Sequence, residues 1–466
     1  MISRTKNITQ QLESSRLFPL LIRLTIPATI AQLVNALYSL VDRMYIGHMP
    51  GTGAIALSGI GLTFPITMMI SAFSCLPGMG GAPLASIALG QGDSKKAQQI
   101  LCNAASLLLA VSFALTLLCS AFLRPLLILF GADAQTMPYA LDYLQTYLLG
   151  TLFVELSFGL NPFINAQGFV LTGTISVVIG AILNIVLDPI LIYTLDMGIR
   201  GAAIATVFSQ FISCLWVIGF LSSRHSLIRL NWRDMLPDRA ILRSICALGI
   251  SPFTFRVNES LIVILINRLL LYYGGSDANL HLASMAILNS IGQIFFMPLL
   301  GIVTGLQPIL SYNYGARNYI RVRSSIRCAR ILSLSCAILM WGGLMLFPRA
   351  ICLLFTEDAV LTDLTEKTIR LMFSTSFVLG LQMINQNAFV AMGNTRFSFL
   401  FGIMRKVLLL IPLALILPHF FGVWGVYAAE MISNPVTTLL THAVFQRFLA
   451  AFEKEVCDTN PCTQTP

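Results

Sequence analysis

Charged residues are scarce in this sequence, and their scarcity excludes an ordinary water-soluble fold. Only 11% of the 466 residues are Asp, Glu, Lys or Arg, whereas 56% are hydrophobic and the mean hydropathy is +0.80. A soluble domain carries about 25% charged residues. The sequence therefore predicts a polytopic membrane protein. The net charge of +9 does not indicate nucleic-acid binding, because most of the Lys and Arg residues fall in connections on one side of the predicted spans.

Motifs of enzymes and metal sites are also missing. The sequence has no HExxH, GxSxG or P-loop motif and no CxxC pair, and its five histidines are scattered. Most of the ten cysteines lie inside apolar runs, where a reduced thiol acts as a small apolar side chain. We therefore expect no catalysis, no bound metal and no cofactor. Without a nucleotide-binding motif, any transport must draw its energy from an ion gradient.

Long apolar runs are abundant, and the first of them carries polar residues. The stretch from Leu24 to Gly47 has 24 residues, enough for a helix of about 36 Å that crosses a bilayer. Asn35, Tyr38 and Asp42 share one face of that helix, and Pro27 favours a bend in it. An acid in hydrocarbon costs roughly 3 kcal/mol, so it normally faces a bundle interior or a water-filled cavity. This pattern indicates a transport pathway.

Twelve such spans predict an all-α membrane protein. Their approximate limits are residues 20–46, 54–78, 97–121, 138–160, 170–194, 199–221, 244–272, 282–306, 328–348, 368–392, 398–418 and 423–449. Basic clusters between Arg224 and Arg243 and between Arg317 and Arg330 lie on the side of both termini, which predicts cytoplasmic termini. The polar start of the chain leads directly into a full-length span, so no cleavable signal peptide is expected.

An internal repeat divides the chain into two halves of six spans. A shift of 225 residues aligns Pro27 with Pro252, Gly80 with Gly305, Gly168 with Gly393, and LFGAD with LFTED, and a shift of 224 aligns GIRG with GVWG. Because six is even, the two bundles are parallel repeats, and alternating access by rocking follows. The predicted parts are an N-lobe (1–221), a cytoplasmic connecting loop (222–243), a C-lobe (244–449) and a cytoplasmic tail (450–466).

Ionisable residues depart from the repeat. Asp42 aligns with Asn267, and the fifth span has Asn184 and Asp188 one helical turn apart, whereas the matching VLLLIPLALILP is apolar. The second half has Glu259 where the first half has Val34. These asymmetries predict a titratable site in the first lobe alone. We also expect few buried cations in the predicted spans, namely Arg23, Arg256, Arg268 and Arg370.

Simpler interpretations remain open for each acid. Asp42 and Asp188 fall near the outer ends of their spans, where water can solvate a carboxylate. Glu259 follows Arg256 by three residues, a spacing that allows an ion pair on a helix. Asn184 adds a third polar group to the face of Asp188, which favours a functional cluster in the first lobe.

The chain resembles the multidrug and toxic compound extrusion transporters over nearly its whole length. The resemblance rests on PATIAQLVNALYSLVDRMYIGHM in the first span, GAPLASIALGQGDSKKA after the second, ILNIVLDPILIY and GIRGAAIAT in the fifth and sixth, and VAMGNTRFSF after the tenth. The resemblance implies export of organic, often cationic compounds, driven by inward H⁺ or Na⁺. We expect a monomer in the bacterial cytoplasmic membrane, with small organic molecules and lipid as its partners.

Site residues carried over from the family fall mainly in the first lobe. The resemblance implies cation coupling by Asp42, Asn184, Asp188 and Thr206, and helix bending at Pro27. It places Tyr38 and Asn161 in the solute cavity, where we also expect Asn35 and Glu259. One branch of the family pairs its equivalent of Glu259 with an acid after the tenth span, but this chain has Asn394 there. This departure favours coupling in the first lobe.

Three rival functions remain open. A flippase of a lipid-linked precursor or polysaccharide in the same superfamily is the main alternative, and a more basic central cavity would favour it. A carrier of the major facilitator group would have a Gly/Asp/Arg-rich loop after the second span, where this chain has GQGDSKKA. A membrane-embedded enzyme lacks support from any catalytic motif.

Overall fold

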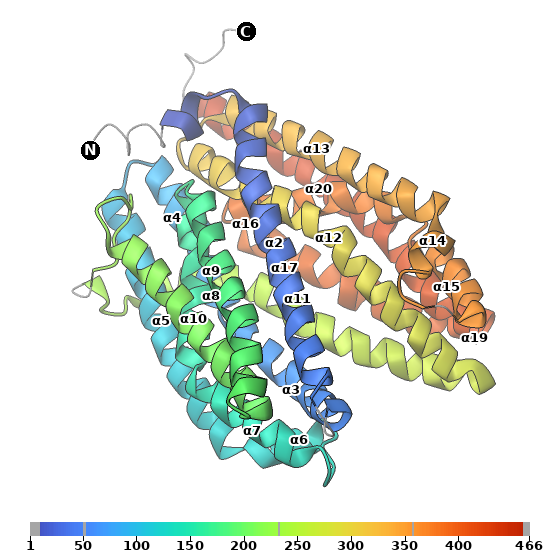
Figure 1. The fold of residues 1–466 in the computed structure, drawn as a ribbon. Helices are drawn as coiled ribbons and strands as arrows, with labels where there is room; N and C mark the ends of the chain where they lie inside the picture. Colours follow the sequence, from blue (N-terminus) through green and yellow to red (C-terminus); the bar gives the residue numbers. More distant parts are fainter. Residues whose placement is uncertain (1–9, 50–52, 232–233, 357, 460–466) are drawn as a thin grey trace. The chain divides into compact units, whose positions relative to one another are not determined.

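The computed structural model describes residues 10–49, 53–231, 234–356 and 358–459, and this part of the chain is helical with no strand. It divides into two compact units (Figure 1). The first unit comprises residues 10–14 and Ile30–Arg256, and the second comprises Ser15–Thr29 and the chain from Val257 onward. Two long helices, α2 (Leu17–Gly47) and α11 (Arg239–Tyr273), therefore contribute to both units.

The first unit is a bundle of helices centred on α8. Its elements are α3 (Gly53–Phe73), α4 (Cys75–Gly90), α5 (Ser94–Ala121), α6 (Leu123–Leu129), α7 (Met137–Leu149), α8 (Thr151–Ala166), α9 (Val170–Pro189), the π-helix η1 (Ile190–Thr194) and α10 (Gly198–Ser222). Helix α8 packs against α4, α5, α9 and α10. The buried apolar side chains include Ile70, Leu127, Leu144 and Leu148, which fill the core around α3, α6 and α7.

The second unit has the same kind of architecture. Its elements are η3 (Gly275–Asp277), α12 (Ala278–Gly315), α13 (Tyr319–Leu346), α14 (Pro348–Cys352), α15 (Ala359–Met372), η4 (Ser376–Val378), α16 (Leu379–Ala391), α17 (Thr395–Ile403), the π-helix η5 (Met404–Leu410), α18 (Ile411–Ile416), α19 (Pro418–Phe421) and α20 (Val423–Thr459). Helix α16 packs against α12, α13 and α20, and Leu288, Phe295 and Ile369 lie in the core.

Each of the twelve predicted spans corresponds to a helix or a broken helix. Among the described residues, nine helices are long and apolar enough to cross a membrane, and α7 with α8 makes a tenth span that bends by 58°. The other two predicted spans are α15 with α16, which are separated by η4, and α20. Large apolar side chains such as Phe113 and Leu339 are exposed, as expected for a surface that contacts lipid. The predicted all-α fold is confirmed.

Several predicted boundaries are wrong by about ten residues. The second span was expected to end at 78 and the eighth at 306, but α4 continues to Gly90 and α12 to Gly315. Pro83 and Pro308 therefore lie inside helices. Proline normally ends a helix in water, whereas a membrane helix tolerates it when neighbouring groups satisfy the freed carbonyl.

Local geometry explains why the repeat preserves particular residues. Asp133 accepts hydrogen bonds from the backbone amides of Gln135 and Thr136, and Asp358 accepts them from Val360 and Leu361. Both aspartates thus stabilise the start of the helix that follows. The hydrogen bonds from Thr136 and Gln135 also lower the pKa of Asp133 below its ordinary value.

Two further pairs of repeat residues are glycines with a left-handed backbone. The φ angles are +89° at Gly168 and +70° at Gly393, and +56° at Gly198 and +57° at Gly422. Other residues adopt such angles only at a cost. The same turns therefore follow equivalent helices in the two units, which supports the predicted internal repeat.

The division into units differs from the boundaries predicted at 221 and 244. The start of α2 packs in the second unit: a Cβ on Gly305 of α12 would lie 2.8 Å from the backbone nitrogen of Thr25. The start of α11 packs in the first unit, where a Cβ on Gly80 of α4 would lie 2.7 Å from the backbone nitrogen of Gly249. Hydropathy marks where a helix begins and ends but not which bundle it joins.

Candidate functional site

Helices α9 and α10 bring together three of the residues predicted to couple to a cation. Asn184 and Asp188 lie one turn apart on α9, and both are buried. The amide nitrogen of Asn184 lies 3.3 Å from Asp188 Oδ1 and 3.4 Å from Thr206 Oγ1 on α10. The tight packing of α9 on α10 fixes this polar group in an otherwise apolar bundle.

Asp42 joins the group from α2. Its carboxyl lies within electrostatic range of Asp188, and Tyr38, one turn earlier, lies within range of both carboxyls. The hydroxyl of Tyr193 in η1 donates a hydrogen bond to the backbone carbonyl of Tyr45, which ties the end of α2 to the segment after Asp188. The fourth predicted coupling residue is therefore placed beside the other three within the first unit.

Three buried oxygen atoms of this group accept no hydrogen bond. Among the described residues, Asp42 Oδ1, Asn184 Oδ1 and Asp188 Oδ2 are buried without a partner. Buried acceptors normally have a donor, so such a concentration of free oxygens needs an explanation. A proton on one carboxyl or a hard cation among the oxygens would supply it. The described residues contain no group of three His, Cys, Asp or Glu side chains that could hold a metal.

The other predicted site residues of the first lobe are placed differently. Asn161 donates hydrogen bonds to the carbonyl of Gly173 (2.9 Å) and the hydroxyl of Ser176 (2.6 Å), which joins α8 to α9. Asn35 is half-buried on α2. Helix α2 continues without interruption through Pro27. The solute-cavity roles of Asn35 and Asn161 and the bending role of Pro27 stay predictions.

The sequence pattern did not identify Glu155 on α8 as a candidate functional residue. It is fully buried, and both carboxylate oxygens lack a hydrogen-bond partner among the described residues. Its surroundings include Thr151, whose hydroxyl is also unpartnered, and Tyr147 and Cys75, which lie within electrostatic range. The available signal was an acid inside the apolar run GTLFVELSFGL of the fourth predicted span.

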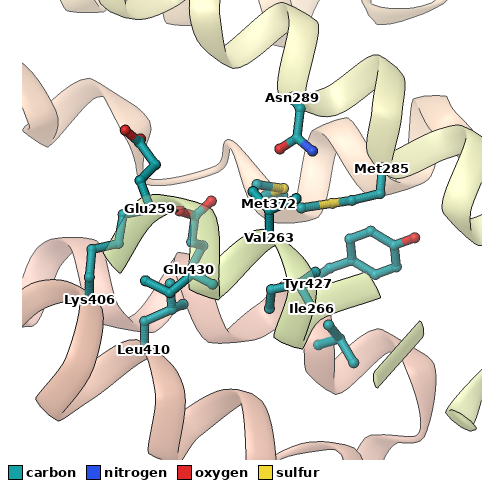
Figure 2. A pocket seen from close by; sticks show the side chains of 12 residues that line it. Glu259, Val263, Ile266, Met285, Asn289, Met372, Lys406, Leu410, Tyr427 and Glu430 are labelled. Carbon is teal, nitrogen blue, oxygen red and sulfur yellow. Dashed lines mark hydrogen bonds and ion pairs between the residues drawn. The ribbon is translucent and has the colours of Figure 1, made fainter. Parts of the chain in front are cut away.

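The second unit contains a small cavity of about 90 Å³ (Figure 2). Glu259 of α11 lines it, as do Lys406 of η5 and Glu430 of α20. The remaining wall is formed by Ile262, Val263, Ile266, Met285, Asn289, Met372, Leu410, Val426 and Tyr427. Glu259 therefore lines a cavity, and its role in binding a solute stays a prediction. Its pairing with Arg256 stays a prediction, because Arg256 is the last residue of the first unit.

The predicted shortage of basic residues within the spans is wrong for the second unit. Lys406 Nζ lies 3.1 Å from Glu430 Oε1, and Arg405 is buried beside them. Both cations directly precede VLLL, and η5 includes them in the eleventh span. The apolar residues around them dominate the hydropathy of this span, so the sequence pattern did not reveal them. Glu430 was overlooked although it interrupts the apolar twelfth span.

The two groups occupy equivalent places in the repeat. Glu430 is the counterpart of Thr206 at the shift of 224 residues, and Val263 and Met372 are the counterparts of Tyr38 and Tyr147 at the shift of 225. Each unit thus has a polar group between its first, fourth and sixth spans. The first lobe is not alone in holding ionisable groups, which corrects the predicted asymmetry.

Comparisons with known proteins agree with these features. The MatE family model matches twice, at residues 27–190 and 256–416, once in each half of the repeat. The multidrug export protein MepA of Staphylococcus haemolyticus is 26% identical over 433 residues, covering 92% of this chain and 93% of that protein. MepA of Staphylococcus aureus is 24% identical over 428 residues, covering 92% and 93%.

Solved structures show the same fold. A MATE transporter in a bent conformation matches with a TM-score of 0.89 and 24% identity, covering 97% of this chain and 99% of that one. A transporter of the MOP superfamily from Pyrococcus furiosus matches with a TM-score of 0.88 and 24% identity, covering 96% and 98%. The family model matches both halves of the chain, and the fold is that of solved MATE transporters. The chain therefore belongs to the MatE family of multidrug export transporters.

Proposed function

We propose that this protein exports organic cations across the bacterial cytoplasmic membrane in exchange for inward H⁺ or Na⁺, with both termini in the cytoplasm. The observation that carries the proposal is the set of three buried, unpartnered oxygens on Asp42, Asn184 and Asp188. A cationic solute and a coupling ion both neutralise such a set, so they compete for it. Competition for one site is the simplest basis for exchange.

The exchange follows from the electrostatics of two neighbouring carboxyls. Two carboxylates in a dry site cannot both ionise cheaply, so the pair of Asp42 and Asp188 holds one proton tightly. Na⁺ would instead use the same oxygens with Thr206 Oγ1 as ligands. Either ion removes the negative charge that anchors a cationic solute, and the solute leaves outward. A membrane potential that is negative inside the cell adds about 2.3 kcal/mol of driving free energy per inward-moving positive charge for every 100 mV.

The experiment uses everted vesicles that contain the protein and a fluorescent lipophilic cation. Uptake into the vesicles should appear when both gradients are applied, and it should be abolished by collapsing one of them, the proton gradient or the Na⁺ gradient, but not the other. The gradient whose collapse abolishes uptake identifies the coupling ion. Uptake that survives the collapse of both gradients, or no uptake under any gradient, would contradict the proposal.

A flippase for an anionic lipid-linked precursor is the second candidate. The presence of the basic residues Arg405 and Lys406 in the second unit favours it. They give the second unit the basic residues that such a substrate requires. Their charges are matched, however, by Glu430 and Glu259 in the same unit. Translocation of a fluorescent anionic lipid in proteoliposomes, without export of cations, would favour this candidate over the first.

A further inference from the structure

The exchange described above makes no use of the carboxyl of Glu155. This side chain is fully buried on α8, and neither of its oxygens has a hydrogen-bond partner among the described residues. In the same part of the chain, no Lys, Arg or His side chain lies within 4 Å of it. Burial without donors makes a charged carboxylate far more costly than the neutral acid, so Glu155 holds a proton in this structure.

Two helix interruptions lie next to Glu155. The second span breaks at Ser74, between α3 and α4, and Cys75 at the start of α4 lies within electrostatic range of Glu155. The fourth span bends by 58° between α7 and α8, and Thr151 is the first residue after the bend. Thr151 lies one turn before Glu155, and its buried hydroxyl has no partner among the described residues, so it can donate to a carboxylate or accept from a neutral acid. Broken membrane helices commonly line ion sites.

The interruption of the fourth span recurs in the second unit, but the acid does not. The segment η4 separates α15 from α16, and Gly380 stands 225 residues after Glu155. A Cβ on Gly380 would lie 2.5 Å from the carbonyl oxygen of Ser333, so the packing there leaves no room for a side chain. Met372 is the counterpart of Tyr147. The interruption therefore belongs to the common scaffold, whereas the acid and the tyrosine belong to the first unit alone.

Tyrosine hydroxyls lie between Glu155 and the acids of the candidate site. Tyr147 of α7 is within electrostatic range of Glu155 and of Tyr38. Tyr38 is in turn within range of Asp42 and Asp188. A hydroxyl both donates and accepts hydrogen bonds, so it passes a proton on by accepting one and releasing its own. The two tyrosines thus supply two relay positions between the acid pair and Glu155.

We propose that Glu155 is a second proton-binding residue of the transport cycle, which receives a proton from the pair of Asp42 and Asp188 through Tyr38 and Tyr147. The inference rests on the proposed export function with H⁺ as the coupling ion. In the transfer, one carboxyl of the pair loses a proton and becomes a carboxylate, Glu155 gains a proton and becomes neutral, and both tyrosines end unchanged. The pair then takes up another proton, so one cycle moves two protons for each exported cation.

Infrared spectroscopy of the purified full-length protein in detergent tests whether Glu155 holds a proton. The C=O stretching band of a neutral carboxylic acid is separate from the bands of carboxylates and amides. Glu155→Gln should remove one carboxylic acid from the spectrum at pH 7. Asp142→Asn, which changes an exposed carboxyl of α7, is the matched control and should remove none. A carboxylic acid band that Glu155→Gln leaves unchanged would overturn the proposal.

The accumulation of a fluorescent monovalent cation at equilibrium measures how many protons are exchanged. In everted vesicles with the membrane potential clamped at zero, a pH difference of one unit supports about 100-fold accumulation for two protons and about tenfold for one. The native protein should reach the first value and Glu155→Gln the second. Glu155→Asp keeps a carboxyl and should stay above Glu155→Gln. Equal accumulation by the native protein and Glu155→Gln would overturn the proposal.

Tyr147→Phe separates the relay from the second proton site. The change removes a hydroxyl but no acid, so the initial rate of uptake should fall several-fold while the accumulation at equilibrium stays at the native value. Tyr139→Phe, on the same helix α7, is the matched control and should leave the rate unchanged. A native rate in Tyr147→Phe would contradict the relay through this residue.

The proposed function and this inference fail in different ways. Accumulation driven by Na⁺ alone, or driven by protons equally well in Glu155→Gln, leaves export standing and overturns the role of Glu155. No accumulation by the native protein under any gradient would contradict export itself, and the proton on Glu155 would then have no transport cycle to serve.

Discussion

Single buried acids distinguish this protein from an inert helical bundle, and Glu155 is the most isolated of them. Its carboxylate oxygens accept no hydrogen bond from the described residues, and no ion pair compensates its charge there. Burying a carboxyl under such conditions destabilises the fold whether it is charged or neutral. A buried acid that destabilises the fold in this way either has a function or lies where the bundle tolerates the destabilisation.

Replacement of Glu155 by leucine should therefore stabilise the protein. The side chains are similar in volume, and the change removes a desolvation cost of roughly 1–3 kcal/mol. Thermal unfolding in detergent at pH 8 should show a higher midpoint than for the native protein. Asp142→Leu, on the exposed face of α7, controls for the loss of one charge and should leave the midpoint nearly unchanged. A clearly lower midpoint for Glu155→Leu would show that the carboxyl makes stabilising contacts.

The sequence predicted some of these residues and missed others for a physical reason. Asp42, Asn184 and Asp188 were found because they share helix faces within apolar runs or break the repeat. Arg405, Lys406 and Glu430 were missed because the apolar residues around them dominate the hydropathy of their spans. Only the π-helix η5 and the packing on α20 show that Lys406 faces a cavity.

At the scale of the helices, close crossings depend on glycine. A Cβ at Gly305 would lie within 2.8 Å of the Thr25 backbone, and one at Gly80 would lie within 2.7 Å of the Gly249 backbone. Both contacts are with backbone atoms, which cannot turn away as a side chain can. The repeat preserves Gly80 and Gly305 because each unit contains the same crossing.

Gly305→Ala should consequently destabilise the second unit. The new methyl group pushes α12 away from α2, and overpacking of this kind costs about 1–3 kcal/mol. Gly61→Ala on α3 is the control, because no atom lies within 4 Å of its added Cβ. Thermal unfolding in detergent should give a lower midpoint for Gly305→Ala only. Equal midpoints for the two variants would contradict the crossing.

Several side chains of the first unit hold the connection between the two halves, and they include Gln98, Ser106 and Gln167. The buried Gln167 Oε1 accepts hydrogen bonds from Ser226 Oγ (2.9 Å) and from the backbone amides of Leu227 (2.7 Å) and Ile228 (3.2 Å). The sequence predicted a polar loop at 222–243 but not its attachment. Polar composition indicates exposure, whereas the anchoring partner lies 59 residues away in sequence.

Gln167→Ala should loosen the part of this connection around residues 226–229. Removing this acceptor leaves the backbone amides of Leu227 and Ile228 without a partner, so the segment around Arg229 should open more often. Limited trypsin digestion of the purified protein should cleave the variant at Arg224 or Arg229 several times faster than the native chain. Gln135→Ala, in the exposed turn before α7, is the control. Equal cleavage rates would show that other contacts hold the loop.

At the scale of the whole molecule, the repeat was the most informative feature of the sequence. It predicted two related bundles because helix-starting aspartates and left-handed glycines recur at the same interval. It did not predict that α2 and α11 each divide between the units, two residues after Pro27 and four after Pro252. Long-range packing determines which bundle each half of such a helix joins, and hydropathy does not encode that packing.

The central claim is that the buried acids of the first unit exchange an organic cation for a coupling ion. In the proposed exchange, the charge of Asp188 is required and its shape is not. Asp188→Asn keeps the hydrogen-bonding size of the side chain but can neither release a proton nor offer a negative charge. The matched control is Asp142→Asn, which removes a carboxylate from an exposed position of the same unit.

The most direct test compares the initial rate of gradient-driven uptake of a fluorescent lipophilic cation into everted vesicles containing equal amounts of native protein, Asp188→Asn, Asp42→Asn or Asp142→Asn. The account predicts that both site variants lose at least about 90% of the native rate, because neutralising either acid removes the switch in charge, while Asp142→Asn keeps the native rate. Native rates in both Asp188→Asn and Asp42→Asn would contradict it.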